Sequence, residues 1–252
     1  MTSAALSCCL AVLHVLPLQF VRGGPRDQAS TVLRRAVAVA VSTCLSVLCV
    51  QCTRSTASLA WLGLRWDWGA LALGLSLYST LFLGPLVCAA ADCVAGAELP
   101  RLPAHLLLRN LVIAPLTEEI VFRACICTLL LSQRVALARV ILLSPALFSA
   151  VHLHHVREAM CYKGKSLWQA LLAPHQLFQA LYTWVFGVLA AFAYLRSGSL
   201  LAPLVLHAAC NYSGLPRPPR HAAAALVHVG GLCSFTALVA YLATGPYLHS
   251  EL

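Results

Sequence analysis

An all-α integral membrane protein is the fold class that the sequence predicts, built as a polytopic helical bundle of about eight transmembrane helices. Of the 252 residues, 60% are hydrophobic and only 10% are charged. A soluble domain has about a quarter of its residues charged, and a disordered chain combines low hydrophobicity with high charge. The composition therefore excludes both classes. The length is that of a single membrane domain covering residues 1–252.

The expected helices are the apolar stretches with few or no charges, since a helix needs about 20 apolar residues to cross a bilayer. One stretch is unusual because charged residues lie inside it. It follows the interval Asp92–Arg109 and is apolar to Leu131 apart from Glu118, Glu119 and Arg123. The remaining expected helices are Met1–Val21, Ala36–Cys52, Gly69–Ala91, Val140–Val151, Ser166–Leu195, Ser197–Leu215 and Ala222–Thr244.

The charge of the chain is basic, with a net value of +9 from 17 Lys and Arg against 8 Asp and Glu. The basic residues stand singly between apolar stretches, which is typical of loops that set membrane topology or touch anionic headgroups. Membrane lipid, and not nucleic acid, is therefore the expected partner. Most of the 12 Cys lie inside apolar stretches, and neither Cys8-Cys9 nor Cys125-x-Cys127 has the spacing of a zinc site. We expect no metal, no cofactor and no disulfide framework.

Three charged residues lie where charge is costly. At mid-bilayer each costs about 2.5–3.5 kcal/mol on the insertion scale. On a helix, Glu119 and Arg123 are four residues apart and can form an ion pair. Glu118 lies about 100° around the helix from Glu119, so it need not share that pair. Two carboxylates in different environments can take different acid and base roles. The alternative is a purely structural ion network, and intramembrane ionisable residues favour function over it.

A histidine and a His/Asn pair supply further polar groups in apolar surroundings. His152 lies four residues after Phe148, on the same helical face and deeper than His154 and His155, which we interpret as interface residues. His207 and Asn211 are also four residues apart and project from one face of an apolar helix. Both can donate hydrogen bonds to an oxyanion. The structural alternative, a polar contact between helices, is equally compatible with this pair alone.

Taken together, these groups make a complete set for amide hydrolysis without a covalent intermediate. A carboxylate takes a proton from water, and an imidazole holds that water and later protonates the leaving amine. The His/Asn donors stabilise the developing negative oxygen. The sequence contains neither a Gly-x-Ser-x-Gly elbow nor a His-Glu-x-x-His zinc motif.

At this point the chain resembles the type II CAAX prenyl endopeptidases, the Ras-converting enzymes of the glutamate intramembrane protease (ABI/CPBP) family. Each motif alone is weak, but three in the same order within a polytopic chain are specific. The resemblance covers roughly residues 101–215, which is the expected catalytic core. The motifs that carry it are Glu118-Glu119-x-x-x-Arg123, Phe148-x-x-x-His152 and His207-x-x-x-Asn211.

The resemblance implies an enzyme, a metal-independent endopeptidase that removes the last three residues from a C-terminal CAAX sequence after its Cys is prenylated. It also implies a multi-pass protein of the endoplasmic reticulum membrane with an intramembrane catalytic cavity. Its partners would be farnesylated or geranylgeranylated CAAX proteins such as Ras-like small GTPases. The implied site residues are Glu118 and His152 for water activation, His207 and Asn211 for the oxyanion hole, and Glu119, Arg123 and Phe148 in support.

Two other functions remain open from the sequence. The first is a non-enzymatic membrane scaffold or transporter-like protein of the same fold, in which the charged cluster is an ion or proton path; the intact catalytic set argues against it. The second is a zinc-dependent intramembrane protease, although no helical His-x-x-x-His pair exists. Its ligands would be His152, His154, His155 and His207, with Glu118 as base.

Overall fold

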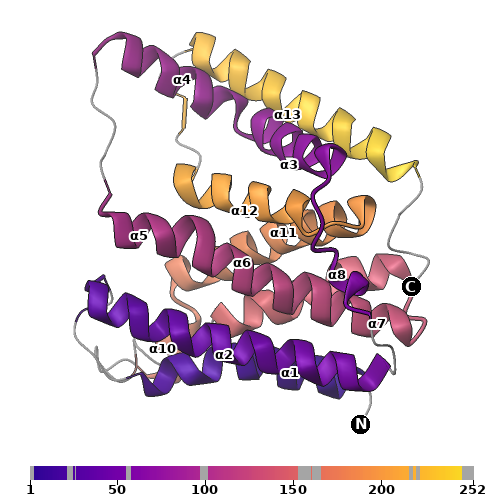
Figure 1. Cartoon of the computed structure of the whole chain (residues 1–252). Helices are drawn as coiled ribbons and strands as arrows, with labels where there is room; N and C mark the ends of the chain where they lie inside the picture. Colours follow the sequence, from indigo (N-terminus) through magenta and orange to yellow (C-terminus); the bar gives the residue numbers. More distant parts are fainter. Residues whose placement is uncertain are drawn as a thin grey trace. The chain divides into compact units, whose positions relative to one another are not determined.

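The structure, a computed structural model, is helical throughout the part of the chain that it describes (Figure 1). Among those residues, three helices are long and apolar enough to cross a membrane, and a bent pair would make a fourth. The chain is therefore a multi-pass membrane protein, and the figure of about eight spans stays a prediction. The three helices are Ala29–Thr53, Pro174–Ser197 and Ala222–Ala243. The described residues are 3–21, 25, 27–54, 58–96, 102–152, 160, 166–215, 218–219 and 222–245.

The chain divides into two compact units. Unit 1 takes the residues up to Gly63 together with Thr117–Phe192, and unit 2 takes Leu64–Leu116 together with Ala193–His249. The boundary after Gly63 falls in a loop, whereas those after Leu116 and after Phe192 fall inside the helices Ala114–Glu119 and Pro174–Ser197. The assignment of residues 1–252 to a single membrane domain stays a prediction.

Unit 1 is built around η3, a π-helical segment that carries the core of the unit. Every residue from Val121 to Cys127 in η3 is buried. Helices α1, α2 and α8 pack against η3, and α1 and α2 also lie along each other (Figure 1). The elements of this unit are α1 (Ser3–Phe20), α2 (Ala29–Arg54), η1 (Ala60–Leu62), the end of α6 (Ala114–Glu119), η3 (Ile120–Cys127), α7 (Thr128–Ser132), α8 (Leu137–His152), α10 (Leu167–Leu171) and most of α11 (Pro174–Ser197).

The contact between α8 and α11 in unit 1 depends on a glycine. A Cβ added to Gly187 would lie 2.8 Å from the Cβ of Pro145, closer than packed carbons approach. Beside this point the Ser149 hydroxyl donates to the carbonyl oxygen of Ala180 at 2.7 Å. A small residue together with a hydroxyl bond is a common way to hold two membrane helices close together.

Unit 2 is built around α3 and α12. Helix α3 packs on α12 and α13, α4 packs on α13, and α12 also packs on η2. Gly74 permits the close approach of α3 to the backbone of α12, because a Cβ there would lie 2.5 Å from the carbonyl oxygen of Ala202. The elements are α3 (Trp68–Leu81), α4 (Leu83–Val94), α5 (Ala104–Leu108), η2 (Arg109–Ile113), the end of α11, α12 (Leu201–Ser213) and α13 (Ala222–Ala243).

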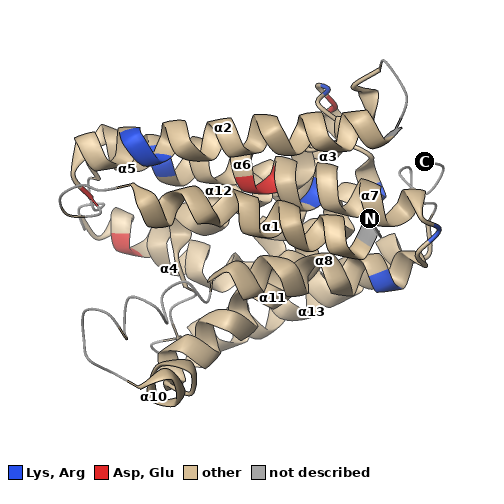
Figure 2. Ribbon diagram, turned by 90° about the horizontal axis from the view of Figure 1, so that it is seen from below, with Lys and Arg blue, Asp and Glu red and all other residues tan. Residues whose placement is uncertain are grey.

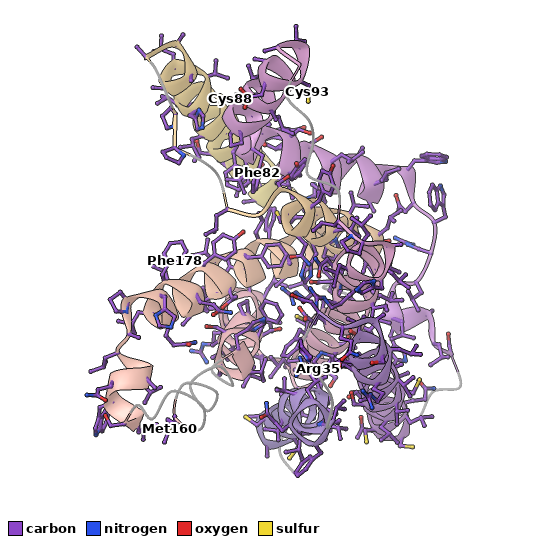
Figure 3. The ribbon with its side chains drawn as sticks, turned by 90° about the vertical axis from the view of Figure 1, so that its left-hand side faces the viewer. Arg35, Phe82, Cys88, Cys93, Met160 and Phe178 are labelled. Carbon is purple, nitrogen blue, oxygen red and sulfur yellow. The ribbon has the colours of Figure 1, made fainter. Side chains whose placement is uncertain are left out.

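The stretch Gly69–Ala91, expected as one helix, is two helices, α3 and α4, bent by 78°. The cause is Pro85, whose ring clashes with the carbonyl four residues earlier and which has no N–H to bond it. That carbonyl belongs to Leu81, and α3 ends there. Pro85 then sits in the first turn of α4, where a missing N–H costs nothing. Phe82 lies at the junction between α3 and α4 (Figure 3). It is buried, and its ring stacks on that of Tyr78 with 5.1 Å between the ring centroids.

The stretch Ser166–Leu195 is likewise two helices, α10 and α11. Helix α11 begins at Pro174, a residue that favours the first helical position and disfavours helix in the residue before it. Helix α10 begins with a capping box between Ser166 and Gln169. The short α10 is thus a separate element, although hydropathy alone joins it to α11.

The outer faces of the long helices are apolar, as lipid contact requires. Helix α11 exposes Phe178, which projects from the helix with 53% of its surface exposed (Figure 3). Coloured by charge, the helices are almost free of Lys, Arg, Asp and Glu along their length, and the acidic part of α6 is an exception (Figure 2). This exception contains two of the predicted site residues.

Candidate active site

Glu118 and Glu119 end α6, directly before the π-helical segment η3. A π-helical turn is wider than an α-helical one and often occurs at functional sites. The carbonyl oxygen of Phe122 in η3 accepts a hydrogen bond from the Ser144 hydroxyl of α8 at 2.7 Å. The Cys127 thiol donates to the same oxygen at 3.4 Å. Side-chain donors on α8 and η3 thus stabilise the irregular backbone that follows the two carboxylates.

The two adjacent glutamates lie in different environments, as the sequence predicts. Glu119 is fully buried, and its Oε2 lies 3.1 Å from Nε of the equally buried Arg123. The Arg123 guanidinium also lies over the Phe148 ring, 4.7 Å from its centroid. Its Nη1 and Nη2 have no hydrogen-bond partner among the described residues, so the ion pair and the ring face stabilise this charge. Glu118, in contrast, is only half-buried.

His152 is oriented by the helix that carries it. Its Nδ1 lies 2.7 Å from the carbonyl oxygen of Phe148, and because a carbonyl only accepts, Nδ1–H is the donor. In the neutral ring Nε2 then carries the lone pair and can accept a proton. The ring also packs edge-on against Phe148, with 4.7 Å between the ring centroids. The Phe148 ring therefore contacts both the Arg123 guanidinium and the His152 imidazole.

His207 and Asn211 both lie on α12 in unit 2. His207 is buried, with 6% of its surface exposed, whereas Asn211 is exposed. The Asn211 amide Nδ2 donates to the carbonyl oxygen of Asn110 in η2 at 2.9 Å. This bond fixes which end of the amide faces η2. An amide nitrogen has two protons, so a second donation from Asn211 remains open.

A family model described as Type II CAAX prenyl endopeptidase Rce1-like matches residues 100–213, a range that contains every site residue predicted above. Curated relatives named CAAX prenyl protease 2 are similar along more of the chain. The Homo sapiens relative is 37% identical over 213 residues, which are 76% of this chain and 64% of the relative. Over residues 100–213 the chain is thus similar to the type II CAAX prenyl endopeptidase family.

Two further relatives with the same name differ in how much of them is covered. The Caenorhabditis elegans relative is 29% identical over 229 residues, 86% of this chain and 85% of the relative. The Arabidopsis thaliana relative is 44% identical over 108 residues, 43% of this chain and 34% of the relative. The chain thus spans less than two thirds of the human and Arabidopsis relatives. No solved structure matches it significantly.

The family's motif residues fall into both units. Unit 1 brings together Glu118, Glu119, Arg123, Phe148 and His152 through the contacts given above, and unit 2 holds His207 and Asn211 on one helix. Their assigned roles stay predictions. His154 and His155, the further ligands of the zinc alternative, lie outside the described residues. Within the described residues, no three His, Cys, Asp or Glu side chains are grouped as metal ligands are.

Two residues that contact Phe122, the neighbour of Arg123, are absent from the predicted site. Ser144 stabilises η3, and nothing in the sequence separates it from other intramembrane serines. His14 lies in α1, buried with 4% of its surface exposed, and its ring packs edge-on against that of Phe122. A signal for His14 did exist, because it is the one His, Lys, Arg, Asp or Glu residue in the stretch Met1–Val21.

Proposed function

We propose that the chain is an intramembrane endopeptidase that removes the C-terminal aaX tripeptide from prenylated CAAX proteins. The similarity to the family model and to relatives named CAAX prenyl protease 2 supports this activity. The observation that carries it is the division between the two glutamates. Arg123 pairs with Glu119, so the half-buried Glu118 is the carboxylate that we propose as the base.

In the proposed mechanism, Glu118 and His152 activate a water molecule. Glu118 takes a proton from the water, and the resulting hydroxide adds to the scissile carbonyl carbon. His152 holds the water through Nε2, since its Nδ1 bonds to the carbonyl oxygen of Phe148. The C–N bond then breaks, and a proton passes from this pair to the leaving amine. The products are a new C-terminal carboxylate on the prenylated Cys and a free tripeptide.

His207 and Asn211 are the proposed donors to the oxyanion that forms on the carbonyl oxygen. Asn211 is preorganised for this role by its bond to Asn110, and preorganised donors stabilise a transition state most effectively. Glu119, Arg123 and Phe148 support the site by keeping the buried charge paired and the His152 ring in place. The residues supply proton transfer and oxyanion binding by themselves, so the proposal includes neither metal nor cofactor.

The proposed substrates are farnesylated or geranylgeranylated CAAX proteins, such as Ras-like small GTPases. The proposed location is the endoplasmic reticulum membrane. A multi-pass protein reaches a lipid-anchored C-terminus without extracting it from the bilayer. The exposed apolar faces of the long helices suit such a substrate.

The test is cleavage of a farnesylated CAAX peptide by the purified full chain in liposomes. The matched controls are the same peptide without its farnesyl group and the Glu118→Gln chain. We expect release of the tripeptide from the farnesylated peptide alone, with the rate unchanged in EDTA or phenanthroline. Loss of activity in chelator with recovery on adding zinc would instead support the zinc protease. No cleavage under any condition would support the scaffold or transporter.

A further inference from the structure

The helical run that contains η2 carries a proline, Pro115, at a position where helices rarely hold one. Pro115 is buried and is the second residue of α6, which continues η2 without a break. Inside a helix, proline removes one backbone N–H and its ring crowds the carbonyl four residues earlier, so it is the least favourable residue there. Local rules of this kind are broken mainly at functional or strained sites. Pro115 is therefore a candidate for a role in function.

The register of η2 identifies the carbonyl that Pro115 leaves without a backbone donor. The N–H of Ala114 donates to the carbonyl oxygen of Arg109, five residues earlier. In the same register, the N–H of residue 115 would donate to the carbonyl oxygen of Asn110. Proline has no N–H to donate, and this oxygen accepts from Nδ2 of Asn211 instead, at 2.9 Å. The missing backbone donor and the side-chain bond thus meet at one oxygen atom.

We propose that Pro115 is a positioning residue for Asn211, because it leaves the Asn110 carbonyl to the amide that donates to the oxyanion. This inference rests on the proposed function. The three residues lie in unit 2, where η2 packs on α12. One amide proton bonds to Asn110, and the planar amide then fixes the direction of the second proton. Without the first bond the amide would turn more freely, since the last torsion of an asparagine side chain has broad minima.

An N–H at position 115 would allow this run to take the regular α-helical register. The N–H of Ala114 would then donate to the carbonyl oxygen of Asn110 and not to that of Arg109. The oxygen would point along the helix axis towards its own backbone donor. The Asn211 amide would have to share this oxygen or lose it, so its orientation would be less well defined.

Two changes at position 115 separate the missing N–H from the shape of the ring. Pro115→Ala removes the ring and supplies an N–H, whereas lactic acid in place of Pro115 has the methyl group of alanine with an ester oxygen instead of the N–H. The matched control is Pro103→Ala. Pro103 is exposed and precedes α5 in the same unit, and a helix start needs no N–H from it.

The assay is kcat and KM on a farnesylated CAAX peptide with the full chain in liposomes, together with the melting temperature. We expect Pro115→Ala to lower kcat by about three- to tenfold, less than the loss of a whole oxyanion donor, because the amide is misdirected and not removed. KM should stay within about twofold, since the oxyanion is absent from the bound substrate. The melting temperature should not fall, because alanine is the better helix former.

The lactic acid chain should keep kcat within about twofold of the unsubstituted chain, because it restores the absence of the N–H. Pro103→Ala should leave kcat unchanged. Equal kcat values for the alanine and lactic acid chains would overturn the inference, since the N–H would then have no effect. A Pro115→Ala chain that does not fold would also overturn it, because Pro115 would then have a structural role.

A second pair of chains, both carrying Asn211→Ala, shows whether Pro115 acts through Asn211. In that background Pro115→Ala should change kcat by less than about twofold. A loss as large as in the unsubstituted background would overturn the inference, because Pro115 would then act elsewhere, for example through the helix that carries Glu118.

The same measurements separate this inference from the proposed function. If Asn211→Ala is slow and Pro115→Ala is not, only the inference fails. If Asn211→Ala cleaves normally, the oxyanion role of Asn211 fails together with the inference, while the endopeptidase activity stands. If the unsubstituted chain does not cleave, the proposed function fails as well.

Discussion

The two π-helical segments, η3 in unit 1 and η2 in unit 2, are alike in pattern and different in use. Each presents a backbone carbonyl that accepts from a side chain of another helix: Phe122 O from Ser144, and Asn110 O from Asn211. The sequence explains why the Asn110 carbonyl in η2 is available to a side chain. In a π-helix this carbonyl would accept from the N–H five residues later, and that residue is Pro115, which has no N–H.

The difference lies in burial and in the donor. All but the first residue of η3 are buried, and its donor Ser144 is buried as well; η2 has no buried residue, and its donor Asn211 is exposed. The bond in η3 is therefore part of the frame around the Glu119–Arg123 pair. The bond in η2 instead orients an amide that keeps a second proton for another acceptor. We infer that substitutions in unit 1 affect stability and turnover separately, whereas those at Asn211 affect turnover.

The sharpest test of unit 1 is Glu118→Gln, which preserves shape and removes the proposed base. Turnover should fall by about 10²–10⁴-fold, the usual contribution of a general base. The melting temperature should stay near that of the unsubstituted chain, because Arg123 keeps its partner Glu119. The measurement is kcat on the farnesylated peptide. A folded Glu118→Gln chain with most of its activity would show that the base is another residue.

Glu119→Ala should have the opposite signature, a loss of stability. It leaves the buried Arg123 without its carboxylate, and breaking a buried ion pair from one side costs about 3–5 kcal/mol. The Phe148 ring offsets only part of this cost. The measurement is thermal unfolding in detergent, with Glu118→Ala as the matched control. Equal melting temperatures for the two variants would contradict the division of roles between the glutamates.

Most of the fold follows from the sequence because hydropathy marks what lipid requires. The expected Val140–Val151 and Ala222–Thr244 correspond to α8 and α13. The expected start of α2 at Ala36 is late, since the helix begins at Ala29 and carries Arg34 and Arg35 in its first turns. The arginines limit the apolar stretch but not the helix, so hydropathy alone places the start of α2 too late.

The sequence predicts those site residues whose charge is costly to place in an apolar stretch, and it does not single out the others. Glu118, Glu119 and Arg123 stand out because each is charged in an apolar stretch. His14 and Ser144 are neutral, so their cost depends on neighbours that only the fold supplies. The π-helical register of η2 and η3 is also absent from the side-chain pattern, because an extra residue in a turn leaves no change in composition.

In unit 2, Asn211→Ala tests whether the amide acts in the transition state. Removing one oxyanion donor typically lowers turnover by about 10²–10³-fold, while KM should change little because the oxyanion does not exist in the bound substrate. The matched control is Ser213→Ala on the same helix, whose hydroxyl pairs with Tyr78 of α3. An interhelical hydrogen bond in a membrane contributes about 0.6 kcal/mol on average. If both variants lowered only the melting temperature, the structural role of Asn211 would be the correct one.

The smallest expected effect is that of Ser144→Ala, which removes the side-chain donor to η3. The Phe122 carbonyl would retain the Cys127 thiol at 3.4 Å, a weak donor, and the net contribution of the lost hydrogen bond is about 0.5–1.5 kcal/mol. The melting temperature should therefore fall, with kcat on the farnesylated peptide within about threefold at a temperature where the chain is folded.

The matched control is Thr128→Val, because the Thr128 hydroxyl is equally buried but has no hydrogen-bond partner among the described residues. Its removal should be neutral or stabilising. A Ser144→Ala chain as stable as Thr128→Val would mean that the bond to η3 contributes nothing. A large loss of kcat at full stability would instead mean that η3 transmits its geometry to the carboxylates before it, and that the frame and the chemistry of unit 1 cannot be separated.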